Sequence, residues 1–483
     1  SPMEARILDE FRAVVGKGLI TEASQLHTYE CDGLTNMRVL PQAVLLPTST
    51  ADVQAIVRIC QREKIPFVAR GSGTGLSGGA LPVETGVLIS LARMNHILEV
   101  DLPNARVVVE PGVVNSDVTQ RVASHGYFFA PDPSSQSVCT IGGNLAENSG
   151  GAHCLKYGFT TTHVLAVEVV LPDASIVHLG SRALDRPGYD LPGIFVGSEG
   201  TLGIATKVVL RVVKKPAVIQ TLLAAFNTTT EAGAAVSGII GAGMLPAAIE
   251  MMDNLAIQAA EAAVHAGYPN CGGLLLVELD GPAAEVEHLM DQVGEICTQC
   301  GAWEIRVAQS DAERALVWKG RKAAFAAVGR ISPNYIVQDG VVPRTALPKI
   351  LSEIERMSAA DGLRVANVFH AGDGNLHPLV LYDRRIPGQE ERATELSINI
   401  LRLCVKFGGS ITGEHGVGAE KKMMMGEMFA EPDLETMQLV RCAFDPEHLS
   451  NPGKVFPRTR MCAERTGPYQ PHPLEVAGVA QFF

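Results

Sequence analysis

Two histidines flank a tight-turn signal in the stretch HAGDGNLHP, where His370 and His377 stand on either side of Asp373-Gly374. Glycine accepts positive φ without steric cost, so the Asp-Gly pair predicts a tight turn between two short strands. Antiparallel pairing about that turn would place His370 opposite His377, with Cβ atoms roughly 5 Å apart on one face. Two imidazoles so placed can reach one metal ion. The spacing also suits a loop-capping histidine beside a packed one, and this stretch alone leaves both interpretations open.

A carboxylate and a third imidazole follow in TGEHGVG, as Glu414 and His415. His370, His377 and Glu414 form a two-histidine, one-carboxylate set, which holds a divalent metal such as Zn, Mn or Fe and leaves coordination positions open. Such a metal can chelate the hydroxyl and one carboxylate oxygen of a 2-hydroxy acid and lower the hydroxyl pKa. Neighbours in an extended segment face opposite ways, so we assign His415 as the general base. The alternative is a buried structural histidine.

Three segments rich in small residues precede this region: RGSGTGLSGG (70–79), PDPSSQSVCTIGGNLAENSGG (131–151) and VGSEGTLGI (196–204). Loops without side chains let several backbone N–H groups approach a diphosphate closely. Each segment could be a simple turn, but three in one domain favour a long ligand that touches all of them.

The surrounding pattern predicts the elements that position these residues. Between residues 44 and 212, short β-rich runs such as FVAR, VLISL, HVLAVEVVLPD and ATKVVLRVV alternate with helices, including STADVQAIVRICQREK. Beyond residue 216 the helices TTTEAGAAVSGIIGAG, MMDNLAIQAAEAAVHAG and PAAEVEHLMDQVGEICTQCG are separated by strands such as GGLLLVELDG. We therefore expect four parts: an N-terminal helical segment (1–36), a first domain (37–215), a second α+β domain (216–456) whose last part returns to the first, and a Pro-rich tail (457–483).

Composition narrows the class of protein. The 483 residues are 46% hydrophobic and 19% charged, which is typical of a globular chain, and the net charge is −12. An acidic chain without a Lys/Arg cluster argues against nucleic-acid binding. No run is apolar enough to insert in a membrane and we expect no signal peptide, so the prediction is a cytoplasmic protein whose ten cysteines are reduced thiols. Cys297 and Cys300 are expected to pack in a helix.

Several of these strings resemble a known family. RGSGTGLSGG, PDPSS, GGNLAENSGG, GSEGTLGI and NPGK resemble the FAD-binding domain of vanillyl-alcohol-oxidase-like (PCMH-type) flavoproteins, and HAGDGNLHP with GEHGVG resembles their C-terminal FAD-linked oxidase domain. More narrowly, YECDGL, GGAHCLKYG, EMMDNLAIQAAE and VGRISPNYIVQDG resemble the catalytic D subunit of bacterial glycolate oxidase, also called glycolate dehydrogenase. The resemblance implies an α+β fold, with a two-subdomain FAD-binding domain followed by an α+β substrate domain.

The resemblance also implies cofactor contacts and chemistry. Hydride would pass from the substrate carbon to flavin N5, with FAD held non-covalently because the loop lacks the tethering His or Cys of some relatives. The residues implied to contact FAD are Arg70, Gly71, Ser72, Gly73, Thr74, Gly75, Leu76, Ser77, Gly78, Gly79, Pro131, Asp132, Ser134, Ser135, Gly142, Gly143, Asn144, Asn148, Gly150, Gly151, Ile204 and Asn451.

Arg321 matches the arginine that relatives use for the substrate carboxylate, although it could be a surface residue of WKGRK. Relatives that oxidise D-2-hydroxyglutarate carry polar residues where this chain has Val337 and Leu379. A second carboxylate would then be buried without a cation, which favours a small mono-acid. Glycolate fits best, and D-lactate is the alternative.

Reduced FAD has no further electron carrier in this chain. The resemblance implies two partners, a second flavin-type subunit and an iron–sulfur subunit that passes electrons to quinone. Two other classes stay open: a metal hydrolase, and a flavin subunit that only transfers electrons.

Overall fold

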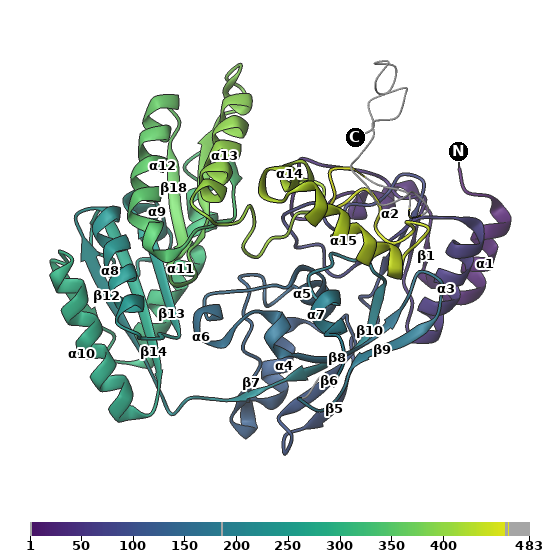
Figure 1. Ribbon diagram of the computed structural model, residues 1–483, viewed down its shortest axis with the longest axis horizontal. Helices are drawn as coiled ribbons and strands as arrows, with labels where there is room; N and C mark the ends of the chain where they lie inside the picture. Colours follow the sequence, from purple (N-terminus) through teal and green to yellow (C-terminus); the bar gives the residue numbers. More distant parts are fainter. Residues whose placement is uncertain (1, 185–186, 459–461, 463–483) are drawn as a thin grey trace. The chain divides into compact units, whose positions relative to one another are not determined.

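The computed structural model describes residues 2–184, 187–458 and 462. The chain folds into two compact units, each built from separated segments (Figure 1). Unit 1 comprises Ser1–Ser149, Phe159–Lys214 and Glu414–Phe483, and unit 2 comprises Gly150–Gly158 and Lys215–Gly413.

The first sheet of unit 1 has the strand order β1-β2-β4-β3. Strands β2, β4 and β3 run parallel, whereas β1 is antiparallel to β2. Helices α1 and α3 pack against this sheet through a core that includes Phe11, Ile56 and Phe67. Helix α3 begins after Ser49, whose hydroxyl accepts a hydrogen bond from the Asp52 backbone N–H. The bounds are β1 Leu19–Ile20, β2 Ala43–Leu45, β3 Phe67–Arg70, β4 Val87–Ser90, α1 Ala5–Val15 and α3 Thr50–Glu63.

The second sheet of unit 1 is antiparallel, with the order β5-β6-β10-β8-β9. Helices α4, α5 and α7 contribute apolar side chains to its core. A small two-stranded sheet joins β7 and β11. The bounds are β5 Ile97–Asp101, β6 Arg106–Val109, β7 Tyr127–Phe128, β8 Val164–Val170, β9 Ile176–Gly180, β10 Ile204–Arg211, β11 Val213–Lys214, α4 Asn115–Val122, α5 Ile141–Glu147 and α7 Leu191–Phe195.

Short helical segments complete unit 1. The chain re-enters this unit at residue 414, and α15 is the last helix or strand among the described residues. The bounds are η1 Gly16–Gly18, α2 Ala23–Leu26, η2 His27–Tyr29, η3 Ala123–His125, η4 Thr160–His163, η7 Lys422–Met424, α14 Met425–Met428 and α15 Glu431–Phe444.

Unit 2 is built on an antiparallel sheet with the order β15-β12-β14-β13-β18-β19-β17, to which β20 and β16 add beside β18. Helices α8, α10, α12 and α13 cover one face, and α9 and α11 cover the other. The strand bounds are β12 Val218–Phe226, β13 Ala248–Asp253, β14 Gly273–Gly281, β15 Glu304–Val307, β16 Asn334–Val337, β17 Gly340–Val341, β18 Val365–His370, β19 Asn375–Leu376 and β20 Pro378–Tyr382. The helix bounds are α6 Cys154–Tyr157, α8 Thr229–Gly241, α9 Asn254–Val264, α10 Ala283–Gln299, α11 Asp311–Val328, η5 Arg344–Ala346, α12 Leu347–Asp361, η6 Ala371–Asp373 and α13 Gln389–Lys406.

The predicted strands and helices are largely confirmed, with one clear exception. Residues 251–253, predicted as the start of a helix, instead end strand β13, and α9 starts at Asn254. Asp253 explains the change, because its carboxylate caps α9 by accepting the Ala256 N–H. Most of the predicted Pro-rich tail lies outside the described residues.

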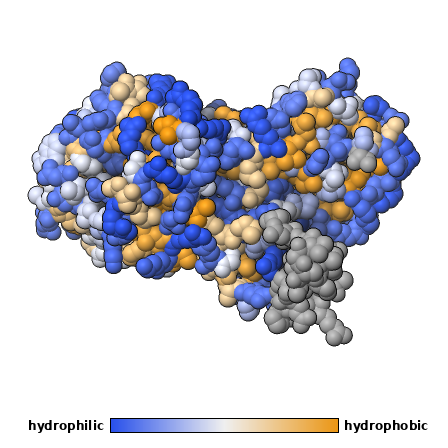
Figure 2. Space-filling model, turned by 90° about the horizontal axis from the view of Figure 1, so that it is seen from above, coloured by the Kyte–Doolittle hydropathy of each residue, from blue (hydrophilic) through white to orange (hydrophobic). Residues whose placement is uncertain are grey.

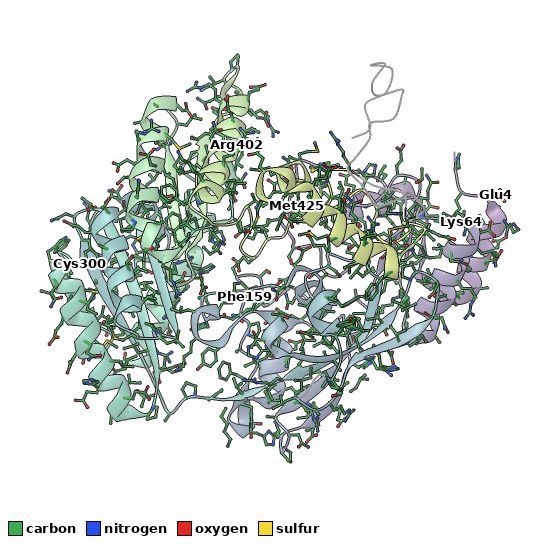
Figure 3. The ribbon with its side chains drawn as sticks, viewed as in Figure 1. Glu4, Lys64, Phe159, Cys300, Arg402 and Met425 are labelled. Carbon is green, nitrogen blue, oxygen red and sulfur yellow. A yellow bond between two sulfur atoms is a disulfide. The ribbon has the colours of Figure 1, made fainter. Side chains whose placement is uncertain are left out.

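The prediction that all ten cysteines are reduced is wrong for one pair. Cys442 and Cys462 form a disulfide, and the other eight cysteines are free thiols. Cys297 is buried in α10 as predicted, and Cys300, labelled in Figure 3, is the partly exposed residue that ends this helix.

Hydrophilic residues spread over the face shown in Figure 2, with smaller apolar patches between them. Among the described residues, no helix combines the length and apolar content needed to cross a bilayer.

Candidate active site

His370 and His377 come together in unit 2, but not by the predicted pairing. Strand β18 ends at His370, which pairs with Asn375, because the three residues of η6 occupy the turn. The prediction that His370 pairs directly with His377 is therefore wrong. The imidazoles nevertheless lie close: their ring centroids are 5.1 Å apart at 85°, and each ring offers a nitrogen within 4.8 Å of the other's. Two nitrogen ligands at that separation can share one divalent ion.

Glu250 orients the first of these rings. It lies opposite His370 on the neighbouring strand β13 and is only 1% exposed. Its carboxylate oxygens lie 2.8 and 3.0 Å from His370 Nδ1. A carboxylate on Nδ1 fixes the tautomer that carries the lone pair on Nε2, as is common for metal-binding histidines.

Glu250 also contacts the predicted substrate arginine. Arg321, in α11, is 4% exposed and places Nη2 2.5 Å from a Glu250 oxygen, which excludes the surface interpretation. Its guanidinium lies over the ring of Phe325, whose centroid is 5.6 Å from that of His377. The Arg321 Nε makes no hydrogen bond within the described residues, so this guanidinium keeps a donor for an acid.

Asp339 is the carboxylate that lies beside the second histidine. This fully buried carboxylate has one oxygen 3.3 Å from His377 Nε2. It also accepts hydrogen bonds from Asn375 Nδ2 at 2.7 Å, Thr412 Oγ1 at 2.7 Å and the Gly413 N–H at 3.0 Å. Asp339 thus links the segment that leads into Glu414 to residues 370–377, which we call the histidine hairpin.

Glu414 and His415 begin the last segment of unit 1, directly after Gly413 of unit 2. Consecutive Cα atoms lie about 3.8 Å apart, so Glu414 follows immediately on the Asp339-bound residue. Beyond His415, the N–H groups of Val417 and Gly418 donate to Glu199 at 3.2 and 2.7 Å.

The glycine-rich loop of residues 70–79 closely approaches the second predicted segment within unit 1. A side chain at Gly71 would clash with Thr140 Oγ1, only 2.3 Å from the ideal Cβ position. Arg70 is buried, donates to the Cys31 carbonyl at 2.8 Å and lies against Gly73. Glycine at positions 71 and 73 thus allows the loop to pack closely against the Thr140 and Arg70 side chains.

Asn451 joins the loop to the third predicted segment. Its amide donates to the carbonyls of Gly79 at 2.9 Å and Glu199 at 2.6 Å. Lys454 donates to the Asn451 side chain and to the Leu81 carbonyl, each at 2.7 Å. The NPGK stretch therefore connects segments far apart in the sequence.

The remaining predicted cofactor residues fall on several elements. Pro131, Asp132, Ser134 and Ser135 precede α5; Gly142, Gly143 and Asn144 lie within it; Asn148 caps its C-terminus; Ile204 begins β10; and Gly150 and Gly151 belong to unit 2. Asn144 bonds to Asn115 at 2.8 Å and to Ser149 at 3.3 Å, so its side chain supports the loop.

Unit 1 also buries carboxyl groups that sequence reasoning missed. Burial raises the pKa of Glu199 to about 7, although two backbone N–H groups favour its charged form. Burial and the nearby Glu199 charge also raise the pKa of Glu147 well above its ordinary value. Burial lowers the pKa of Lys454 to about 8. Glu250 and Asp339 were missed too; for Glu250 the available signal was a charged residue within an otherwise apolar strand, whereas Asp339 lies between β16 and β17.

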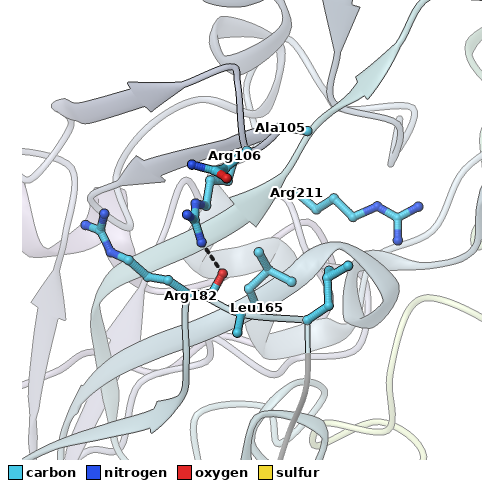
Figure 4. A pocket seen from close by; sticks show the side chains of 8 residues that line it. Ala105, Arg106, Leu165, Arg182 and Arg211 are labelled. Carbon is cyan, nitrogen blue, oxygen red and sulfur yellow. Dashed lines mark hydrogen bonds between the residues drawn. The ribbon is translucent and has the colours of Figure 1, made fainter.

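A separate hollow of about 590 Å³ lies on the antiparallel sheet of unit 1 (Figure 4). Two of its three arginines are already paired with acids, Arg106 with Asp101 and Arg182 with Glu99. None of the predicted site residues lines it, so it is not the candidate active site. The lining residues are Asn104, Ala105, Arg106, Leu165, Arg182, Ala183, Leu184 and Arg211.

Comparison with known proteins identifies the family. Residues 41–180 match the FAD binding domain family, and residues 215–455 match the family described as FAD linked oxidases, C-terminal domain. The chain belongs to the FAD-linked oxidases. It is 50% identical over 452 residues to the glycolate oxidase subunit GlcD of Escherichia coli (strain K12), covering 93% of this chain and 91% of that protein. It is therefore an FAD-dependent 2-hydroxy acid oxidoreductase.

Other relatives agree with this placement. Glycolate oxidase subunit GlcD of Bacillus subtilis (strain 168) is 38% identical, covering 90% of this chain and 94% of its own, and a D-lactate dehydrogenase of Anaerostipes hadrus is 33% identical, covering 86% and 89%. The fold resembles that of 4-ethylphenol oxidase from Gulosibacter chungangensis, with a TM-score of 0.78, 21% identity and coverage of 94% of this chain and 97% of that one. This confirms the predicted fold class.

The histidine hairpin requires glycine at position 374. Gly374 has a φ of 72°, and a Cβ there would lie 2.1 Å from the Val342 carbonyl oxygen. Gly388 has a φ of 76° but no atom within 4 Å of its Cβ position, so it is a matched control. We expect Gly388→Ala to lower the free energy of unfolding by about 1 kcal/mol, and Gly374→Ala to lower it by several kcal/mol in denaturant titrations. Equal losses would show that the hairpin tolerates the side chain.

The raised pKa of Glu199 predicts a pH dependence of stability. The folded chain retains a proton that the unfolded chain releases near 4.5, so stability falls as pH rises from about 4.5 to 7. Glu199→Gln removes this dependence and should gain on the order of 3 kcal/mol relative to wild type across that window. Urea titrations at pH 5 and 7.5 measure the difference, with exposed Glu84→Gln as control. Parallel pH profiles in wild type and Glu199→Gln would contradict the assignment.

Proposed function

We propose that this chain oxidises glycolate to glyoxylate, with His370, His377 and Glu414 holding a divalent metal. The observation that carries the proposal is the pair of imidazoles beside buried Arg321, with carboxylates next to both rings. The donor set suits a divalent ion: two nitrogens lie within 4.8 Å, and Glu414 directly follows the residue bound to Asp339.

Each residue has a defined task in this proposal. Arg321 binds the substrate carboxylate with the donors that Glu250 leaves unused. His415 accepts the hydroxyl proton as general base. FAD, held non-covalently by the glycine-rich segments, supplies the hydride acceptor, and the divalent ion supplies a Lewis acid.

Two apolar residues support a small substrate with a single carboxylate. Val337 on β16 lies directly opposite Leu379 on β20, and Leu379 is fully buried. Neither can neutralise a second carboxylate, which supports a mono-acid over a diacid. D-lactate is the second candidate, favoured by the similarity to D-lactate dehydrogenases; one extra methyl group changes binding by only about 1–3 kcal/mol.

We also propose that electrons leave through partner subunits, one of flavin type and one with iron–sulfur clusters, toward quinone. The names of the two GlcD relatives, each a glycolate oxidase subunit, support an assembly. Any attachment to a membrane would run through those partners.

The substrate is tested by mixing FAD-loaded protein anaerobically with glycolate, D-lactate, L-lactate or D-2-hydroxyglutarate and following loss of flavin absorbance. We expect the fastest bleaching with glycolate and none with D-2-hydroxyglutarate. Removing the metal with a chelator should abolish bleaching without releasing FAD, and Zn²⁺, Mn²⁺ or Fe²⁺ should restore it. Bleaching by D-2-hydroxyglutarate alone would refute the substrate, and full activity in metal-free protein would refute the metal.

Glu250→Gln tests the metal-binding role of the hairpin. Loss of the charge that orients His370 should lower metal affinity about 10- to 100-fold, and loss of the Arg321 partner should alter the KM for the acid. Glu278→Gln is the matched control, since Glu278 is also buried, at 5% exposure, and lies 2.7 Å from His153 in the same unit. Metal titrations that give equal affinities for both variants would contradict the role of Glu250.

A further inference from the structure

Two sulfur atoms and an imidazole meet in unit 1, at residues the proposed function does not use. Cys442 lies in the last turn of α15, His448 follows that helix, and Cys462 lies further along the chain. Cys442 and Cys462 form a disulfide with Cα atoms 5.5 Å apart, and His448 Nε2 lies 3.1 Å from the Cys462 Sγ. The three ligand atoms all lie within 4.8 Å of one another.

A rigid turn holds two of these three residues. The Asp445 carboxylate accepts the N–H groups of Leu449 at 3.0 Å and Ser450 at 2.9 Å. Arg441 Nη2 donates to the Ser450 carbonyl at 3.0 Å. His448 takes a left-handed conformation, with a φ of 54°, inside this network. The position of its imidazole relative to Cys442 is therefore set by buried hydrogen bonds as well as by the disulfide.

The turn is also fixed to the parallel sheet of unit 1. The Phe67 N–H donates to the Leu449 carbonyl at 2.9 Å, and the Asn451 N–H donates to the Phe67 carbonyl at 2.8 Å. Lys64, labelled in Figure 3 at the end of α3, forms an ion pair with Glu447 at 2.5 Å. None of these bonds involves a sulfur atom, so the frame stays in place when the disulfide opens.

We propose that Cys442, His448 and Cys462 bind one Zn²⁺ ion once a thiol reductant has opened the disulfide. The reductant gives two electrons and two protons, which yields two protein thiols and an oxidised reductant disulfide; zinc binding then releases the two thiol protons. Thiolate and imidazole are ligands that zinc prefers, and three protein ligands with water in the fourth position form an established zinc geometry.

The site has a structural consequence that goes beyond the proposed function. In the oxidised chain the disulfide ties Cys462 to α15, next to the NPGK stretch that joins the glycine-rich segments. In the reduced chain the zinc ion makes the same connection. The link from α15 to Cys462 thus persists in both redox states.

The experiment uses the full FAD-loaded chain with His370→Ala, which weakens the other metal site. The protein is reduced with dithiothreitol, the reductant is removed anaerobically, the protein thiols are counted, and Zn²⁺ is added. Zinc X-ray absorption then separates sulfur ligands near 2.3 Å from nitrogen ligands near 2.0–2.1 Å. We expect all ten thiols and one zinc ion with two sulfur ligands.

Variants assign the ligands. Cys442→Ser and Cys462→Ser should each lose this two-sulfur zinc signal, whereas Cys300→Ser, a partly exposed thiol elsewhere, should keep it. His448→Ala should weaken zinc binding by more than roughly tenfold, since loss of even an outer-shell partner costs 10- to 100-fold. A pair that resists reduction, or a reduced pair whose zinc has only nitrogen and oxygen ligands, overturns the proposal. Its failure would leave flavin bleaching by glycolate unaffected in the chain that retains His370, so the proposed function is tested separately.

Discussion

The contacts of the buried Glu250 carboxylate with Arg321 and His370 are the interaction on which unit 2 depends. At 1% exposure, this carboxylate would be costly to bury without compensation, and both Arg321 and His370 contact it. Three elements must therefore meet at one point: β13 for Glu250, β18 for His370 and α11 for Arg321. A shift of one residue between β13 and its neighbours would turn Glu250 to the face covered by α8 and α10, where Ile249 and Met251 now pack. The register of the sheet and the arrangement of the site are thus a single constraint.

In unit 1, the glycine-rich segments have few side chains that could pack to hold them in place. Side-chain bonds from distant residues replace that packing. Asn451 holds the carbonyls of Gly79 and Glu199, and Glu199 in turn accepts the N–H groups of Val417 and Gly418. The segment that starts with Glu414 and His415 is therefore held in place at Val417, two residues beyond His415. A loop open enough for a cofactor can be rigid when bonds of this kind surround it.

The sequence predicted features that depend on neighbouring residues, and it did not predict contacts between residues far apart in the chain. Local signals were reliable: Ser49 caps α3, the β-rich runs form strands, and His370 and His377 do converge. Contacts between residues distant in sequence were missed, since the residues around Glu250 and Asp339 do not show that these carboxylates lie beside His370 and His377. The hairpin register failed for a local reason, because η6 takes three residues where a two-residue turn was expected. The Cys442–Cys462 disulfide was not predicted, because a sequence does not show which cysteines lie close enough in the fold to bond.

Charge balance links the proposed metal to the proposed substrate. In the proposed site, Glu250 and Asp339 contribute two carboxylates beside the histidines, the proposed ligand Glu414 adds a third, and Arg321 contributes one positive charge. Without a divalent cation, such a set would repel any acid; with one, its charges cancel and a single carboxylate can bind through Arg321. Under the proposed function, Val337 and Leu379 would offer a second carboxylate no compensating charge. Under the proposed function, the electrostatics that favour a metal ion would therefore also favour a substrate with one acid group.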